Sequence, residues 1–145
     1  SVHIAQFLIP MSKLLGFEVT VIDPREAFVN SYKVLEAEVI KKWPDEVIEK
    51  IKINSRSAII TLTHDSKLDD PTLVKALKSD CFYIGALGSK KTHQKRIERL
   101  LKLGLDLKEL SRINGPVGID INAKTPQEIA ISILAQVIEK KQAFT

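Results

Sequence analysis

Small and polar residues gather directly after three apolar segments of the sequence. Asp23 and Arg25 follow the first segment, which ends at Ile22. Residues 63–65 (Thr-His-Asp) follow the second, and the third leads into residues 85–92 (Gly-Ala-Leu-Gly-Ser-Lys-Lys-Thr). A carboxylate in such a place can bind ribose hydroxyls, while glycines with lysine and hydroxyl groups suit a phosphate. Together the three groups indicate a nucleotide-like ligand.

Residues 85–92 are the segment best suited to an anion. They do not form a Walker A motif, which needs four residues between its first glycine and a Gly-Lys pair. Small residues that lead into a helix N-terminus still leave backbone amides free for a phosphate, with Ser89, Lys90 and Thr92 beside them. The alternative is a tight turn from strand to helix without a ligand.

Residues 63–70 hold the side chains best suited to acid–base chemistry. His64 and Asp65 are compatible with a general acid or base and with simple ligand contact, and we favour contact. Asp70 has the alternative role of capping the helix that follows. The three histidines lack the spacing of a metal site, so we assign no catalytic residue and no metal ligand.

An alternation of helices and strands positions these groups. Apolar residues at helical spacing predict helices, and nearly continuous apolar runs predict strands buried on both faces. Such an alternation implies a doubly wound, mostly parallel, Rossmann-like α/β sheet with helices on both faces. The predicted strands are 17–22, part of 34–40, 58–63, 81–84 and part of 115–121; the predicted helices are 4–15, 45–51, 70–78, 90–103, 107–112 and 125–141.

The first strand of this sheet is expected to be missing from the chain. In dinucleotide-binding folds an acidic residue follows the glycine turn by roughly 20 residues. Counting back from Asp23 places that turn at or just before Ser1, which makes Asp23 a candidate ribose ligand. Its alternative role is a turn with Pro24. A sheet without its first strand leaves backbone groups unpaired, so we expect self-association as a dimer.

Composition limits the class of protein. The 145 residues suffice for one domain, spanning 1–145, and 44% hydrophobic with 28% charged residues is typical of a soluble protein. No apolar run approaches the roughly 20 residues that span a bilayer. The single cysteine, Cys81, fits the cytoplasm and most simply packs in a buried strand. Residues 90–102 carry much of the +4 net charge without aromatic residues, so nucleic acid is not expected.

Four segments in order resemble one family, the xanthine dehydrogenase accessory proteins of the XdhC/CoxI type. The resemblance covers essentially the whole chain and matches the C-terminal Rossmann-like domain of that family. The segments are 16–25 (GFEVTVIDPR), 62–71 (LTHDSKLDDP), 83–93 (YIGALGSKKTH), and 115–121 (GPVGIDI) with 125–130 (TPQEIA).

This resemblance implies a helper protein rather than a catalyst. Such proteins bind the molybdenum cofactor, as molybdopterin or its dinucleotide form, protect it during sulfuration, and pass it to an apo molybdenum hydroxylase. A cofactor sulfurase is a further implied partner. Two departures stand out: family members usually carry a separate N-terminal domain, and they have glycine where this chain has Val2. A β-branched residue there weakens ordinary dinucleotide binding.

The alternative function is an NAD(P)-binding oxidoreductase domain, which rests on Asp23 and the polar strand ends. For Asp120, in a segment rich in turn formers, we slightly favour a structural role over lining the cleft. The candidate cofactor-binding residues are His3, Asp23, Arg25, Thr63, His64, Asp65, Gly85, Gly88, Ser89, Lys90, Thr92 and Asp120.

Overall fold

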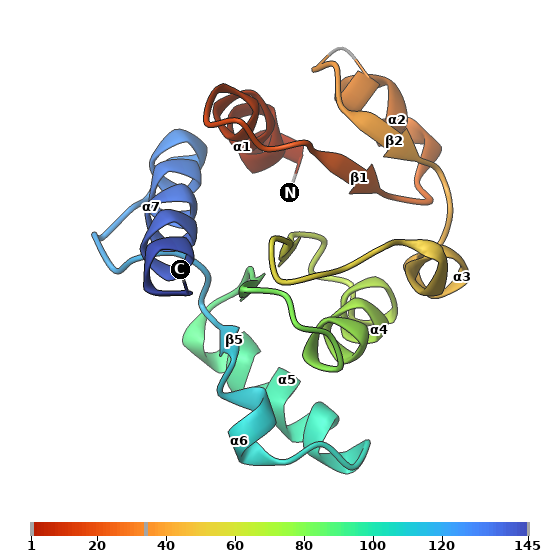
Figure 1. The fold of residues 1–145 in the computed structure, drawn as a ribbon, viewed down its shortest axis with the longest axis vertical. Coiled ribbons are helices and arrows are strands. Elements are labelled where there is room, and N and C mark those ends of the chain that lie inside the picture. Colours follow the sequence, from red (N-terminus) through yellow and green to blue (C-terminus); the bar gives the residue numbers. More distant parts are fainter. Residues whose placement is uncertain (1, 34, 145) are drawn as a thin grey trace.

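Parallel strands flanked by helices form the fold, as the sequence predicts (Figure 1). The computed structural model describes residues 2–33 and 35–144. Its elements are α1 (Val2–Leu14), β1 (Thr20–Ile22), α2 (Glu26–Lys33), β2 (Glu38–Ile40), α3 (Pro44–Val47), the 3₁₀ helix η1 (Ile48–Lys50), β3 (Ala58–Thr61), α4 (Ser66–Leu77), β4 (Tyr83–Ala86), α5 (Lys90–Lys102), α6 (Leu107–Leu110), β5 (Ile113–Asn114) and α7 (Pro126–Phe144).

The strands form two sheets, both parallel. β1 pairs with β2 in one sheet, and the other has the order β3-β4-β5. A doubly wound sheet of order 3-2-1-4-5-6 would have one further strand between β1 and β3. No strand of the described residues occupies that position. The topology is therefore Rossmann-like, with one interruption between its halves.

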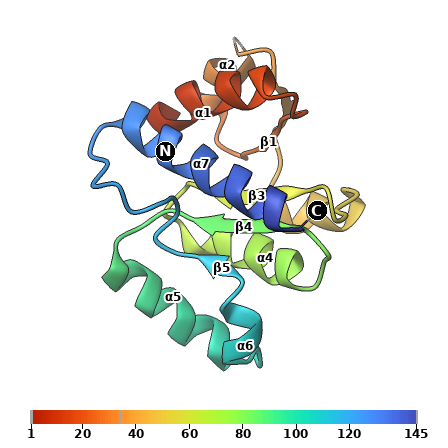
Figure 2. The same ribbon diagram turned by 60° about the vertical axis from the view of Figure 1, so that its left-hand side comes forward.

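Three clusters of buried apolar side chains hold the helices against the sheets. The first joins α4, α5 and α6 to β4 and β5, and the second joins α1 and α7 to the opposite face (Figure 2). The third lies between α1, α2 and the β1–β2 sheet. Helix α1 contributes Ile4 and Leu8 to the second cluster but Ala5 and Ile9 to the third. It thus packs on both sheets.

Helix α4 begins earlier than predicted, because Asp65 and not Asp70 is its cap. The Asp65 carboxylate accepts a hydrogen bond from the Lys67 amide at 2.9 Å, and the helix then runs from Ser66 through Pro71. Asp70 instead forms an ion pair with Arg99 on α5, in which Nε of Arg99 lies 2.8 Å from Oδ2 of Asp70. The prediction relied on the proline as a helix start, but a proline is also tolerated early in a helix that a stronger cap has begun.

Residues 115–121 form a turn rather than the predicted turn and strand. The last strand, β5, lies just before them, and a cis peptide joins Gly115 to Pro116. Gly118 has a φ of +100° and Asn122 a φ of +60°. Helix α2 was not predicted, because its eight residues give too short an apolar pattern. The short strand expected within 34–40 is confirmed as Glu38–Ile40.

The start of α7 agrees with its prediction. The Thr125 hydroxyl accepts a hydrogen bond from the Glu128 amide at 3.1 Å, and the Glu128 carboxylate accepts from the amides of Lys124 and Thr125. This reciprocal cap satisfies donors that a helix end leaves free. Among the described residues, no helix is both long and apolar enough to cross a membrane.

Candidate functional site

The carboxyl ends of β3 and β4 bring two of the predicted groups together. The strands pair in register from Ala58 with Tyr83 to Thr61 with Ala86. Just beyond them, the amide of Leu87 donates to the carbonyl of Thr61 at 2.9 Å. The loop over residues 63–65 therefore lies beside Leu87–Ser89, which we call the β4–α5 turn. Polar groups from two segments meet at one edge of the sheet.

Internal hydrogen bonds hold the 63–65 loop in a constrained conformation. The Thr63 hydroxyl donates to Oδ1 of Asp69 at 2.6 Å and accepts from the Asp65 amide at 3.1 Å. His64 between them has a φ of +65°, a conformation that costs a non-glycine residue about 1–3 kcal/mol. The side chain of His64 is exposed, whereas Asp65 is engaged as the cap of α4. His64 is thus the side chain of this loop best placed to meet a ligand.

The β4–α5 turn is a tightly packed helix start. Gly88 has a φ of +144°, and a Cβ there would come within 2.8 Å of Cγ2 of Thr92. The Ser89 hydroxyl caps α5 by accepting from the Thr92 amide at 3.1 Å. Lys90 is exposed at the first position of the helix. Gly85 is required for another reason, because a Cβ there would overlap Val117.

A buried guanidinium lies beneath this turn. Arg96, on α5, is only 2% exposed. Its Nη2 donates to the carbonyl of Leu87 at 2.7 Å, and its Nη1 donates to Nδ1 of His93 at 2.9 Å. Its Nε has no hydrogen-bond partner among the described residues. The His93 ring in turn packs so closely on Gly115 that a Cβ at that glycine would overlap it.

Burial perturbs the ionisable groups around Arg96. It lowers the pKa of Arg96, and burial together with the charge of Arg96 lowers the pKa of His93. His93 is therefore neutral at neutral pH, which lets its Nδ1 accept from the guanidinium. Burial raises the pKa of Asp69, although the hydrogen bond from Thr63 and the charge of Arg96 oppose this rise. This set of groups is held largely out of water.

Sequence reasoning missed this cluster. Arg96 precedes the buried Leu100 by one helical step of four, so it occupies the apolar stripe of α5. A charged residue in such a stripe was the available signal. The composition argument counted Arg96 only as part of the positive charge of residues 90–102. Nothing local in the sequence indicates that Asp69 or Thr61 would face the same interior.

Asp23 lies in the other sheet and is already fully occupied. It is 2% exposed, and its Oδ1 accepts from the amide and Nε of Arg25, both at 2.9 Å. Its Oδ2 accepts from Nη2 of Arg25 at 2.8 Å and from the Tyr32 hydroxyl at 3.3 Å. A carboxylate offers about four acceptor positions. A ribose hydroxyl would have to displace one of these donors.

The electrostatics of Asp23 agree with this occupancy. Burial alone would raise its pKa, but the hydrogen bonds and charge of Arg25 more than reverse that effect, so the pKa lies below its ordinary value. The pKa of Tyr32 rises to about 12, because of burial and the neighbouring carboxylate. Asp23, Arg25 and Tyr32 therefore form a closed ionic unit.

Two further candidates, His3 and Asp120, lie on other segments of the chain. His3 is exposed on α1, and Asp120 is exposed in the segment before α7. No described residue forms a hydrogen bond or ion pair with either side chain. The prediction that Val2 weakens dinucleotide binding depends on a side chain that the structure does not describe. Ser1 also lies outside the described residues. Among those described, no group of three or more His, Cys, Asp and Glu gathers to hold a metal ion.

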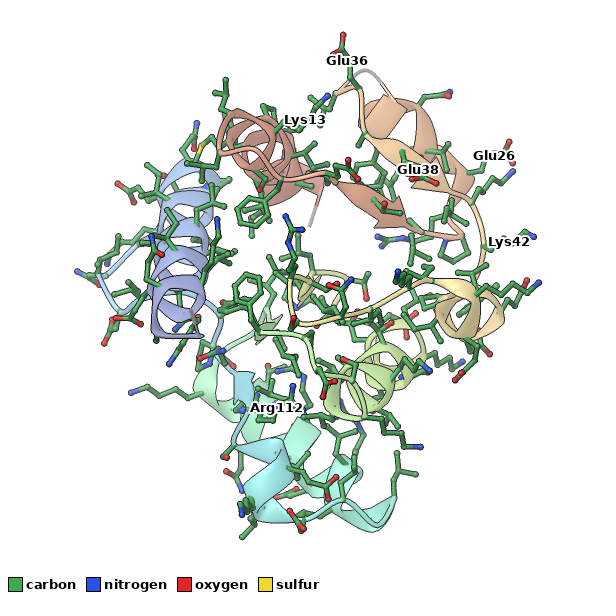
Figure 3. All side chains as sticks on the ribbon, viewed as in Figure 1. Lys13, Glu26, Glu36, Glu38, Lys42 and Arg112 are labelled. Carbon is green, nitrogen blue, oxygen red and sulfur yellow. The ribbon has the colours of Figure 1, made fainter. Side chains whose placement is uncertain are left out.

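A polar pocket lies at the opposite, amino end of β4 and β5. Arg112, labelled in Figure 3, is one of the residues that line it. Arg112 donates to the carbonyls of Leu77, Ser79 and Cys81 at 2.9, 3.2 and 3.0 Å. Its donors thus stabilise the C-terminal end of α4 rather than face a ligand. Cys81 is buried and packs in the first cluster, as predicted.

Parallel strands with helices packed on both faces define a Rossmann-like α/β fold. The comparison with protein families places it further. A family model described as the XdhC Rossmann domain matches residues 1–137. The chain belongs to this family.

Relatives of the chain include longer proteins. The chain is 40% identical over 86 residues to the molybdenum cofactor insertion chaperone PaoD of Escherichia coli, which is 59% of this chain and 27% of PaoD. It is 29% identical over 138 residues to a probable xanthine dehydrogenase component of Bacillus subtilis, covering 92% of this chain and 40% of that protein. A crystal structure described as a xanthine dehydrogenase from Bacillus halodurans matches with a TM-score of 0.81 and 30% identity, over 97% of this chain and 40% of that one.

Proposed function

We propose that this chain assists the maturation of a xanthine-dehydrogenase-like molybdenum hydroxylase by binding the molybdenum cofactor. One observation carries the proposal: the β4–α5 turn lies over a buried, incompletely paired arginine, in a domain similar to a protein named as a molybdenum cofactor insertion chaperone. The cofactor would be the cargo of the protein. The proposed roles of the chain are to retain it and to release it to the apo-hydroxylase.

The residues at the strand ends fit the phosphate of that cargo. Both forms of the cofactor carry phosphate, either as a monoester or within a dinucleotide. The first amides of α5 point outward from a helix N-terminus, where the helix dipole favours an anion. Gly88 adds no side chain above Arg96, and Lys90 supplies a second cation. Exposed His64, on the neighbouring loop, would contact the part of the ligand beyond the phosphate.

The competing function, NAD(P)-dependent oxidoreduction, fits the same residues less well. It requires a carboxylate at the end of β1 to accept from ribose hydroxyls. Asp23 already accepts four hydrogen bonds there, three of them from Arg25. The geometry therefore favours a ligand whose binding depends on the β3 and β4 strand ends.

Binding of the released cofactor tests the proposal directly. Purified protein is mixed with cofactor released from a molybdoenzyme, and retention is measured by gel filtration with detection of molybdenum and pterin fluorescence. We expect retention by the natural protein and weaker retention by Lys90→Met. Lys140→Met, at the opposite end of the sheet, is the matched control and should bind normally. No retention by the natural protein, or tighter retention of NADH or NADPH than of the cofactor, would contradict the proposal.

The partners follow from the same role. We propose an apo molybdenum hydroxylase as the recipient, a cofactor sulfurase as a second partner, and a homodimer as the assembled form. Exposed apolar side chains are available for such contacts, among them Ile131 and Ile138 on the outer face of α7. Sedimentation at micromolar concentration tests the dimer, and a monomer would exclude it.

A further inference from the structure

We infer that the β4–α5 turn is an oxyanion site for the phosphate-bearing end of a ligand, with the buried guanidinium of Arg96 as the cation that retains it. The inference rests on the proposed function and deepens it, because it names the chemical group that this turn binds. Three features support it: the incompletely paired charge, its position under Gly88, and the first amides of α5.

The charge of Arg96 is buried without a carboxylate partner. No carboxylate oxygen of the described residues lies within 4.0 Å of it, although the residue is only 2% exposed. Taking a cation out of water without pairing it is costly, so such a site favours a bound anion. Asp69 attracts Arg96 from beyond this distance. Asp70 also attracts Arg96 from beyond this distance, but its carboxylate is paired with Arg99.

The guanidinium lies directly against the turn. Nη2 of Arg96 donates to the carbonyl of Leu87 and lies 3.5 Å from the position that a Cβ on Gly88 would take. Two buried side-chain polar atoms lack a hydrogen-bond partner among the described residues, Nε of Arg96 and Oγ1 of Thr61. Thr61, on β3, accepts a hydrogen bond from the Leu87 amide through its carbonyl, and its side chain faces the same side of the sheet as that of Ile59, which packs in the first cluster. The two unpartnered atoms thus belong to residues that are both hydrogen-bonded to Leu87.

Helix α5 adds its own donors at the same place. It has 13 residues, and its first turn contains no acidic residue. Ser89 uses its hydroxyl to cap the Thr92 amide, while the amides of Lys90 and Lys91 have no acceptor inside the helix. A phosphate at the turn would therefore meet backbone donors from above and a fixed positive charge from below.

An experiment on the natural protein tests the site without mutation. Inorganic phosphate and pyrophosphate are titrated separately at constant ionic strength, and ¹H–¹⁵N spectra follow the backbone amides and the Arg96 Nε–H. We expect saturable shifts of the Gly88, Lys90 and Lys91 amides and of Arg96 Nε. Stronger binding of phosphate supports a monoester ligand, and stronger binding of pyrophosphate supports a dinucleotide. The inference is overturned if neither anion shifts these resonances.

Variants test the role of the guanidinium. Arg96→Met keeps the apolar stem and removes the charge, so the affinity for the better-bound anion should fall at least about tenfold, and Arg96→Lys should recover part of it. Asp69→Asn removes a competing negative charge and should raise the affinity about twofold to threefold. Arg99→Met, three residues along on the exposed side of α5, is the control and should change affinity less than about twofold. Unchanged affinity in folded Arg96→Met would refute the role of the guanidinium.

The two proposals fail in different ways. If the anions bind at the turn but released molybdenum cofactor does not, the oxyanion site stands and the proposed function fails. If the cofactor binds while the amides of Gly88 and Lys90 and the Nε–H of Arg96 do not move, the proposed function stands and the oxyanion site is overturned.

Discussion

The buried ions beside the two sheets differ in how completely they are hydrogen-bonded. Beside β1, the carboxylate of Asp23 is surrounded by four hydrogen bonds from Arg25 and Tyr32. Beyond β4, the guanidinium of Arg96 has a carbonyl and an imidazole as partners, and its Nε has none among the described residues. Both residues are 2% exposed, so the difference lies in pairing and not in burial.

This difference separates a structural ion from one suited to a ligand. A fully hydrogen-bonded buried pair stabilises its own loop and has little left for a ligand, while breaking it exposes an uncompensated charge. Removing a buried ion that has an unused donor costs the protein less stability. An anion that binds to such an ion gains more, because the unused donor can bond to it. The two halves should therefore respond differently to mutation and to acid.

The largest effect is expected at the closed pair. Asp23→Ala leaves Arg25 and Tyr32 without their acceptor and should lower the free energy of unfolding by about 3 kcal/mol. Urea denaturation measures the change. Glu26→Ala, which breaks the exposed pair with Lys41, is the control and should cost less than about 0.5 kcal/mol. Equal losses in the two variants would mean that the Asp23 unit is not a stabilising element.

The next effect concerns the backbone of the turn. Gly88→Ala places a Cβ near Thr92 at a φ of +144° and should cost about 2 kcal/mol. Gly104→Ala is the control that separates backbone strain from the steric contact with Thr92. Gly104 also has a positive φ, +94°, but no atom lies within 4 Å of an added Cβ. That variant should lose only about 1 kcal/mol in the same urea measurement. A larger loss at Gly104 would show that the contact with Thr92 is unimportant.

A smaller change is expected when the open ion is removed. Arg96→Met loses the hydrogen bonds to Leu87 and His93 but also removes a poorly paired buried charge, so the net loss should be about 1 kcal/mol. Thermal and urea unfolding measure it against Asp23→Ala. If Arg96→Met were as destabilising as Asp23→Ala, the contrast between the halves would be wrong.

The smallest effect is the opposite response of two carboxyls to pH. Asp23 has a pKa below its ordinary 3.8, so its stabilisation is present above that pH and is lost as the pH falls through the folded-state value. Asp69 has a pKa above 3.8, so its protonation adds stability as the pH falls through its folded-state value. Asp69→Asn removes that gain, and it should lose more stability than the natural protein between about pH 7 and pH 4. Parallel urea midpoints for the two proteins over this range would contradict the assignment.

The sequence predicted the sheet better than its boundaries. Runs such as 58–63 are apolar on both faces, and only a covered parallel strand makes that pattern stable. Boundaries depended on competing local signals, as at α4, where Asp65 caps the helix and Pro71 lies inside it. The strand predicted over 17–22 is limited to Thr20–Ile22, because only these residues pair with β2.

The candidate site was predictable where it depends on strand ends. The register of β3 and β4 brings residues 63–65 and 85–92 to one edge, as a parallel sheet requires. The pairing of Asp23 with Arg25 and Tyr32 could not be foreseen, because the sequence does not show whether an aspartate carboxylate is free or already hydrogen-bonded. For Arg96 the one available signal was a charge in the apolar stripe of α5, whereas its hydrogen bond to the backbone carbonyl of Leu87 is encoded by no side-chain pattern.

Helix α1 is the part of the molecule that links the two halves, since neighbouring residues such as Ile4 and Ala5 pack on different sheets. Because α1 packs on both sheets, unfolding of the β1–β2 sheet should also disturb the second cluster, in which α1 packs with α7. Amide hydrogens of β1 and β3 should therefore exchange with solvent in a coordinated way. We therefore expect α1 to carry the cooperativity between the two sheets.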